Sequence, residues 1–151
     1  MQGRILAIDF GTRRIGLAVS DALGITAQGI ATLERTCLED DLRHIEKLVE
    51  EYSADRIVLG NPLSHRGTET AMSERVASFA EKLRRRLNCP VELLDERLTT
   101  AQAGRVLRES GIGIEKRRRA VDRVAATLLL QSYLDRRANE AERDRASGVE
   151  Q

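Results

Sequence analysis

The sequence predicts an α/β fold, in which a mixed five-stranded sheet, three antiparallel strands followed by parallel strands, is flanked by helices. Three observations support this. Apolar runs of strand length with short connections open the chain, and runs with a helical period separate the later strands. A chain of 151 residues with 41% hydrophobic content also suits one domain with a substantial core. We expect that domain to span residues 1–137.

Two strands follow one another between Arg4 and Asp21, as an apolar run, a carboxylate, a glycine turn and a second apolar run. We expect Gly11 and Gly16 to bracket the connection. The first strand is apolar on both faces and should lie inside the sheet, with Asp9 at its far end. Two interpretations of Asp9 stay open: it forms a turn, or it is a metal ligand or phosphate-site acid.

A third strand over residues 25–33 completes an antiparallel meander, because this stretch mixes β-branched and small residues. A helix should follow, since Thr36 and Glu39 have the spacing of a capping box. Its apolar positions recur with a helical period, at Leu38, Leu42, Ile45, Leu48, Val49 and Tyr52.

The middle of the chain predicts a strand, a helix and another strand. Residues 56–60 form a short apolar run before Asn61-Pro62, and a polar loop over 64–68 contains His65, which we interpret as solvated. Apolar residues at helical spacing predict a helix over 69–87, whose three arginines at 84–86 suit the negative end of the helix dipole. The next strand covers 91–96 and ends in two acids.

Carboxylates mark the ends of three elements. Side chains alternate along a strand, so Asp95 and Glu96 should point in opposite directions and only one of them can readily join Asp9. Thr99 with Gln102 predicts the cap of a short helix, and a strongly apolar last helix carries Asp122 in its first turn. An acid there also complements the helix dipole. Because parallel strands joined by helices place their carboxyl ends at one edge of the sheet, the three acids could converge there.

Composition limits the classes of function. Lys and Arg number 25 and Asp and Glu 24, so the net charge of +1 does not itself indicate a nucleic-acid partner, although bases cluster at residues 13–14, 84–86 and 116–119. Cys37 and Cys89 lack the spacing of metal ligands, so we expect buried or idle thiols in a reducing compartment and not a disulfide. We expect a cytoplasmic protein with no membrane segment and a charged, disordered tail over 138–151.

Four ordered motifs resemble the YqgF-type family, whose members are described as pre-16S rRNA nucleases and as Holliday junction resolvases. The motifs lie at residues 7–18, 60–63, 95–100 and 121–126, and the resemblance covers about residues 4 to 136. It implies an RNase H-like fold, an acidic site made of Asp9, Glu96 and Asp122, and a role in maturing the 5′ end of 16S rRNA.

The chemistry that this resemblance implies is physically coherent. Phosphodiester hydrolysis needs an acidified water and neutralised phosphate charge, which Mg²⁺ or Mn²⁺ held by carboxylates supplies. Basic and hydroxyl side chains would contact the nucleic acid, or else form surface ion pairs and turn bonds. The candidates are Thr12, Arg13, Arg14, Arg66, Arg97, Lys116, Arg117 and Arg118.

One departure from the pattern bears on the substrate. The resemblance to resolvases with a complete set of acids implies an Asp-x-x-Asp pattern on the last helix. Here Ala125 stands three residues after Asp122, in place of the second acid. This favours hydrolysis of an RNA strand, in pre-16S rRNA, over cleavage of a four-way DNA junction. The oligomeric state, monomer or homodimer, stays open.

Two other classes of function also fit parts of the sequence. Asp9 and the three residues after it look like the phosphate loop of actin-like ATPases and sugar kinases, but those proteins need a second such domain, for which we see no second Asp-x-Gly loop. A non-catalytic RNA-binding ribosome-assembly factor is the remaining alternative.

Overall fold

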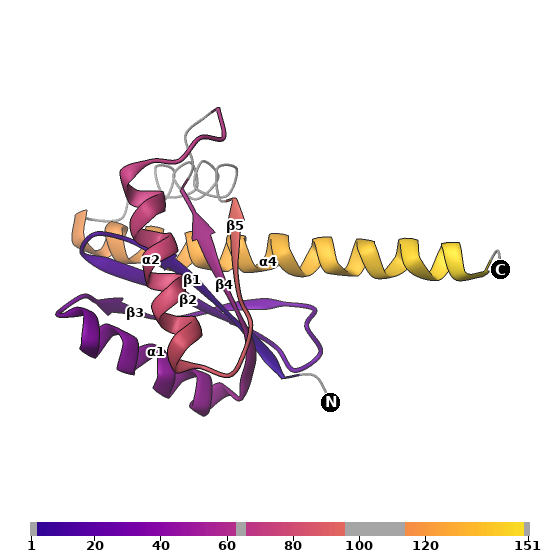
Figure 1. The fold of residues 1–151 in the computed structure, drawn as a ribbon, viewed down its shortest axis with the longest axis horizontal. Coiled ribbons are helices and arrows are strands. Elements are labelled where there is room, and N and C mark those ends of the chain that lie inside the picture. The colour runs from indigo at the N-terminus through magenta and orange to yellow at the C-terminus, as the bar shows by residue number, and fades with distance from the viewer. Residues whose placement is uncertain (1–2, 63–65, 96–113, 150–151) are drawn as a thin grey trace.

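The computed structural model describes residues 3–62, 66–95 and 114–149. For residues 114–118 and 149 it describes the backbone only. Five strands form one sheet with the order β3-β2-β1-β4-β5 (Figure 1). The strands are β1 (Arg4–Phe10), β2 (Arg14–Ser20), β3 (Ala27–Glu34), β4 (Ala54–Asn61) and β5 (Val91–Asp95). The helices are α1 (Leu38–Tyr52), α2 (Ala71–Arg86) and α4 (Ile114–Val149).

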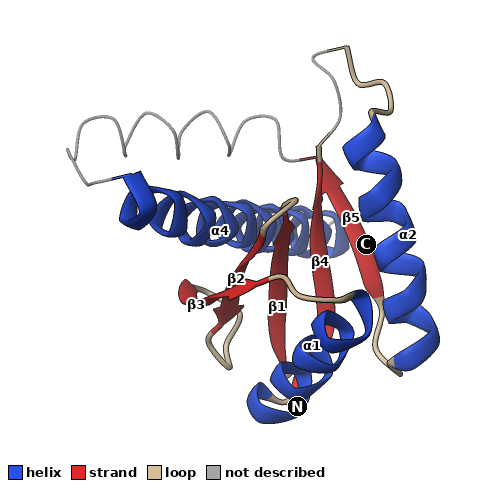
Figure 2. Cartoon of the chain, turned by 90° about the vertical axis from the view of Figure 1, so that its left-hand side faces the viewer, coloured by secondary structure: helices blue, strands red, loops and turns tan. Residues whose placement is uncertain are grey.

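The sheet is mixed as predicted. β1 pairs antiparallel with β2, and β2 with β3, whereas β4 pairs parallel with both β1 and β5. α1 and α2 cover one face and α4 covers the other (Figure 2). The crossovers through α1 and α2 are what allow β4 and β5 to run parallel to β1, because parallel neighbours cannot be joined by a tight turn.

The central strand β1 divides its side chains between two cores. Leu6, Ile8 and Phe10 pack with α1 and α2, whereas Ile5 and Ala7 pack with α4. This division follows from the alternation of side chains along a strand, and it explains why the strand is apolar on both faces.

α4 lies close to the sheet because the strand residues beneath it are small. A Cβ on Gly16 would overlap the backbone carbonyl of Asp122, and a Cβ on Gly29 would stand 2.9 Å from the Thr127 hydroxyl oxygen. Gly16 therefore belongs to β2 and does not bracket the turn, as we expected it to. The turn itself closes with the amide of Gly11 donating to the carbonyl of Arg14, at 2.9 Å.

The cap of α1 also differs from the prediction. Its N-cap residue is Cys37, which provides no side-chain bond, so Thr36 and Glu39 form no capping box. The buried carboxylate of Asp41 instead holds the segment that leads into the helix, accepting from the amide of Thr36 at 3.2 Å. α2 does begin with a capping box, in which Thr70 and Ser73 bond to each other's backbone amides.

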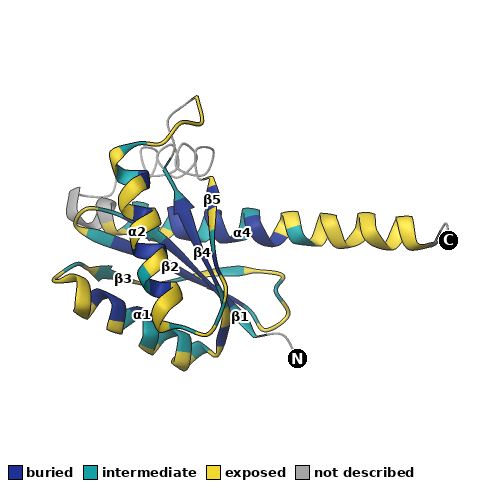
Figure 3. Cartoon of the chain, in the orientation of Figure 1, coloured by how far each residue is buried: buried dark blue, intermediate teal, exposed yellow. Residues whose placement is uncertain are grey.

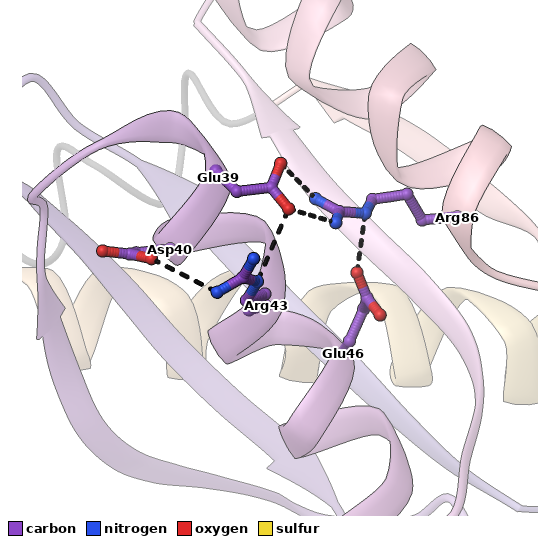
Figure 4. A network of polar contacts seen from close by, with 5 residues as sticks. All are labelled: Glu39, Asp40, Arg43, Glu46 and Arg86. Atoms are coloured by element: carbon purple, nitrogen blue, oxygen red, sulfur yellow. Dashed lines mark hydrogen bonds and ion pairs between the residues drawn. The ribbon is translucent and has the colours of Figure 1, made fainter.

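Ion pairs join the two helices on this face (Figure 4). Arg86, at the end of α2, binds Glu39 at 2.6 Å and Glu46 at 2.7 Å, and Glu39 also pairs with Arg43 within α1. The hydrogen bond from Arg86 is the main cause that lowers the pKa of Glu39. Since Glu39 contacts Arg86, its carboxylate is used between helices and not in a cap.

The last helix extends beyond the sheet, and its distal half is exposed (Figure 3). We predicted a disordered tail over 138–151, and for residues 138–149 this is wrong, because α4 continues through them. Opposite charges three or four residues apart, such as Arg136 with Glu140 and Glu140 with Arg143, favour helix there, and the buried half has already nucleated it. The domain boundary at 137 stays a prediction.

Some predictions fall outside the described residues: the short helix with Thr99 and Gln102, and the loop histidine His65. The strand predicted over 25–33 begins two residues later, because the amides of Ile25 and Thr26 bond to the Asp21 carboxylate in a turn. Within the part of the chain that the structure describes, we find no helix with the length and apolar character needed to cross a membrane.

The first prediction concerns the contact of α4 with β2. Gly16→Ala should lower the free energy of unfolding by about 1–3 kcal/mol, because the added methyl group must displace the α4 backbone. Urea denaturation measures this. Gly148→Ala is the matched control, since a Cβ there meets nothing within 4 Å. If the two variants were equally stable, the close approach at Gly16 would be wrong.

The second prediction concerns the ion pairs of Arg86. The pKa of Glu39 lies below its ordinary 4.5, so this pair stabilises the fold above that pH and the stabilisation is lost as pH falls through the lowered pKa. Arg86→Gln should therefore lower Tm at neutral pH, with a difference that shrinks in acid and in high salt. Arg85→Gln, on the same helix, controls for loss of charge. A Tm difference independent of pH would contradict the role of Glu39.

Candidate functional site

Asp9 and Asp122 come from distant parts of the chain and meet on the α4 face of the sheet. Asp9 is the penultimate residue of β1 and shares its face with Ala7, which packs against α4. Its partner across the ladder is Gly16, over which the backbone of Asp122 lies. The close approach that Gly16 permits therefore brings the two carboxylates together.

This proximity affects the pKa of Asp122. Burial is the main cause that raises its pKa, and the negative charge of Asp9 raises it further. Arg14 acts in the opposite direction, because its Nε donates to Asp122 Oδ2 at 3.2 Å. The side chains of Arg14 and Asp122 are 19% and 27% exposed, so the pair is shielded and still accessible. Two neighbouring acids with one arginine thus form a half-buried acidic site.

The turn between β1 and β2 lies beside these acids and is held by Arg35. Its Nη1 donates to the carbonyl of Gly11 at 3.1 Å and to that of Thr12 at 3.4 Å. Its Nε pairs with the buried Asp41 at 3.3 Å, and its guanidinium stands 4.4 Å from the ring centroid of Phe10. We did not predict Arg35 from the sequence, since no local motif contains it.

The structure locates the predicted nucleic-acid contacts unequally. Thr12 and Arg13 are exposed in the β1–β2 turn, and Arg66 is exposed before α2, whereas Arg14 binds Asp122. Glu96 and Arg97 lie outside the described residues, and only the backbone of Lys116, Arg117 and Arg118, within α4, is described.

The described residues include no group of three or more His, Cys, Asp or Glu side chains placed to hold a metal ion. Of the three predicted acids, the structure shows only Asp9 and Asp122, and it brings these two together. The expectation that Glu96 joins them stays a prediction.

Comparison with solved structures defines the class of fold. The Fowlpox virus resolvase in complex with Holliday junction DNA is similar over 87% of this chain and 97% of its own, with a TM-score of 0.55 and 14% identity. RuvC of T. thermophilus in complex with a Holliday junction substrate is similar over 88% of this chain and 95% of its own, with a TM-score of 0.54 and 12% identity. The fold is therefore the RNase H-like fold of these resolvases.

Sequence comparison then identifies the family. The RuvX family model, described as "Holliday junction resolvase", matches residues 3–136, and the chain belongs to this family. A relative from Koribacter versatilis is 49% identical over 94% of this chain and 93% of its own. A relative from Clostridium acetobutylicum is 46% identical over 87% of this chain and 98% of its own. Both are named "Putative pre-16S rRNA nuclease". The resemblance to the YqgF-type family is thus confirmed.

The third prediction concerns the free-energy cost of Asp122. Because its folded pKa lies above the ordinary 3.8, the fold loses stability as pH rises through that raised pKa and the carboxylate ionises. Asp122→Asn keeps an oxygen for Arg14 but has no charge, so its Tm should exceed that of the wild type at neutral pH, with the advantage disappearing below about pH 3.8.

Thermal unfolding followed by circular dichroism, across the pH range, measures this difference. Asp40→Asn is the matched control, because Asp40 is an exposed aspartate of α1 away from the acidic site. A lower Tm of Asp122→Asn at neutral pH would mean that the bond with Arg14 outweighs burial and the charge of Asp9.

Proposed function

We propose that this protein is a metal-dependent nuclease, a hydrolase that cleaves phosphodiester bonds of an RNA strand in the 5′-end maturation of pre-16S rRNA. The pairing of Asp9 with Asp122 at the end of the central strand carries the proposal, because two like charges are held together in a half-buried position. Such an arrangement lowers the stability of the fold, and this favours a functional reason for it. The names of the relatives support RNA as the substrate.

The residues present fit a divalent cation. Mg²⁺ and Mn²⁺ prefer oxygen ligands, and Asp9 and Asp122 offer carboxylate oxygens on one face of the sheet. Burial is the main cause of the raised pKa of Asp122, and the hydrogen bond from Arg14 offsets it only in part. A bound cation supplies a more acidic water and neutralises charge on the phosphate. We propose Asp9 and Asp122 as ligands.

We further propose Glu96 as the third ligand, in preference to Asp95. In the described part of β5, Leu94 belongs to the core beneath α4, and Glu92 accepts from the hydroxyl of Tyr133, a residue of α4. Alternate residues of this strand therefore face α4, and the same alternation favours Glu96 as the residue on that side.

The remaining residues would bind and orient the nucleic acid. Arg14 holds the Asp122 carboxylate in place, and its other nitrogens are suited to a phosphate oxygen. Thr12 and Arg13 project from the turn next to Asp9, so they are proposed to contact the phosphate backbone. Arg66, Arg97, Lys116, Arg117 and Arg118 remain further candidates. Action on ribosomal RNA would place the protein in the cytoplasm.

A Holliday junction is the second candidate substrate, which the description of the family model favours. The buried Ala125, one turn after Asp122 on the same helix, argues against it, because a fourth carboxylate is missing where similar resolvases have one. We therefore expect cleavage of an RNA strand to be faster than cleavage of a DNA junction.

The fourth prediction tests the nuclease. With Mg²⁺ or Mn²⁺, the purified protein should cleave a precursor 16S RNA. Asp9→Asn or Asp122→Asn should slow cleavage by about 100-fold or more, because loss of a residue that only hydrogen-bonds to a metal ligand already lowers activity by about 10–100-fold. Gel analysis of end-labelled RNA measures the rate, beside a four-way DNA junction. Asp40→Asn should cleave as the wild type does.

Binding of the cation provides an independent measurement. Mn²⁺ should raise the Tm of the wild type and of Asp40→Asn, but not that of Asp9→Asn. Equal cleavage by every variant would indicate a contaminating nuclease. RNA binding without cleavage by any variant would favour the non-catalytic assembly factor.

A further inference from the structure

A basic cavity lies on the face of the sheet opposite to the acidic site, at the same end of β1. A cavity of about 270 Å³ opens between the start of α1 and the middle of α2. Three cationic side chains line it, from Arg35, Arg75 and Lys82, together with the hydroxyl group of Ser78, and none of its described lining residues is acidic. Charge and donors of this kind suit an anion.

The cations of α2 in this cavity are uncompensated. Within the described residues, Arg75 and Lys82 take part in no ion pair, although Lys82 is partly buried. Neither has an acidic residue three or four positions away on α2, whereas Arg84 of the same helix pairs with Glu81 at 3.3 Å. The positive charge is thus available to a ligand.

Arg35 connects this cavity to the β1–β2 turn. Its charge is shared with the buried Asp41, so it contributes hydrogen-bond donors and rigidity more than net charge. The apolar wall consists of Phe10, Phe79 and Leu38, of which Leu38 is 37% exposed. A cavity with cations on one side and an apolar wall on the other suits a phosphate attached to a sugar and base.

The position of the cavity relative to the acidic site follows from β1. Asp9 and Phe10 are consecutive, so their Cα atoms are about 3.8 Å apart and their side chains point to opposite faces. The exposed turn residues Thr12 and Arg13 lie between the two faces. A nucleic acid that passes from one face of the sheet to the other must bend around this turn. Double-stranded DNA, with a persistence length of about 150 bp, resists such bending, whereas a single strand does not.

We propose that this cavity is a second phosphate-binding subsite, which holds single-stranded nucleic acid next to the scissile bond, with Arg75 and Lys82 as its phosphate ligands. This rests on the proposed function, since it assigns part of the same substrate to a second surface. The single-stranded nucleic acid passes over the β1–β2 turn, with one phosphate at the acidic site and another in the cavity.

The test measures binding without cleavage. Fluorescence anisotropy of a labelled single-stranded RNA in EDTA compares the wild type, the double variant Arg75→Gln with Lys82→Gln, and the control Arg85→Gln, an exposed arginine of α2 outside the cavity. The double variant should bind about tenfold more weakly, with a salt slope lower by about 1.4, because each single-strand phosphate contact contributes about 0.7. Arg85→Gln should match the wild type.

Two further measurements separate the outcomes. When cleavage with Mn²⁺ is measured over a range of RNA concentrations, the double variant should keep its kcat and show a higher KM, which distinguishes loss of substrate binding from loss of the acidic site. A Tm equal to that of the wild type would show that it folds normally. Inorganic phosphate alone, in a thermal-shift measurement, tests whether the cavity takes a free phosphate.

If the double variant binds RNA as Arg85→Gln does, the subsite is overturned, and the proposed nuclease is not affected. A stabilisation by inorganic phosphate that the double variant loses, with unchanged RNA binding, also overturns it. If the double variant binds RNA more weakly and no variant cleaves, the subsite stands and the nuclease does not.

Discussion

The contact between Gly16 of β2 and the backbone of Asp122 sets the geometry on which the acidic site depends. A helix packed on the larger β-branched residues that are common in strands would lie farther from the sheet, and Asp122 would then lie farther from Asp9. The small residues Gly16, Ala18 and Gly29 let α4 approach closely instead. Polar bonds then fix its rotation, since Gln131 accepts from the amide of Ala27 at 3.0 Å and donates to the carbonyl of Ile25. Helix packing and the placement of a carboxylate are thus one feature.

The same closeness has an electrostatic cost. Burial and the charge of Asp9 both raise the pKa of Asp122, and Arg14 compensates only in part, since the net shift remains upward. A protein that needed only stability would replace this pair, because a half-buried acid beside another acid contributes nothing to folding. If the two carboxylates held a divalent cation, as we propose, its positive charge would offset their repulsion, which gives a physical reason for the arrangement. Arg14 would keep Asp122 in position while the site is free of metal.

The order of elements and the mixed sheet could be predicted from the sequence, because apolar period and connection length depend on neighbouring residues. The meeting of Asp9 with Asp122 was predicted as well, but the rule that carboxyl ends of parallel strands share an edge covers only Asp9. The prediction of Asp122 in the first turn of the last helix is wrong, because α4 begins at Ile114. The packing function of Gly16 could not, since it depends on a helix more than a hundred residues away. The helical tail was missed because it lacks an apolar face, and charge spacing alone is a weak signal. Arg35 acts through Phe10, the turn and Asp41, which no motif joins.

The alternation of β1 couples the two faces of the molecule. Asp9 contributes to the acidic site and Phe10 to the wall of the basic cavity, so one strand end serves both surfaces. The β1–β2 turn connects them, and Arg35 ties this turn to the buried Asp41 of α1. A change in the packing of α1 would therefore move the turn relative to Asp9, although α1 itself lies on the other side of the sheet. The acidic site on the α4 face thus depends on the helices of the opposite face for its alignment, and the buried carboxylate of Asp41, paired with the partly exposed Arg35, holds the turn beside it.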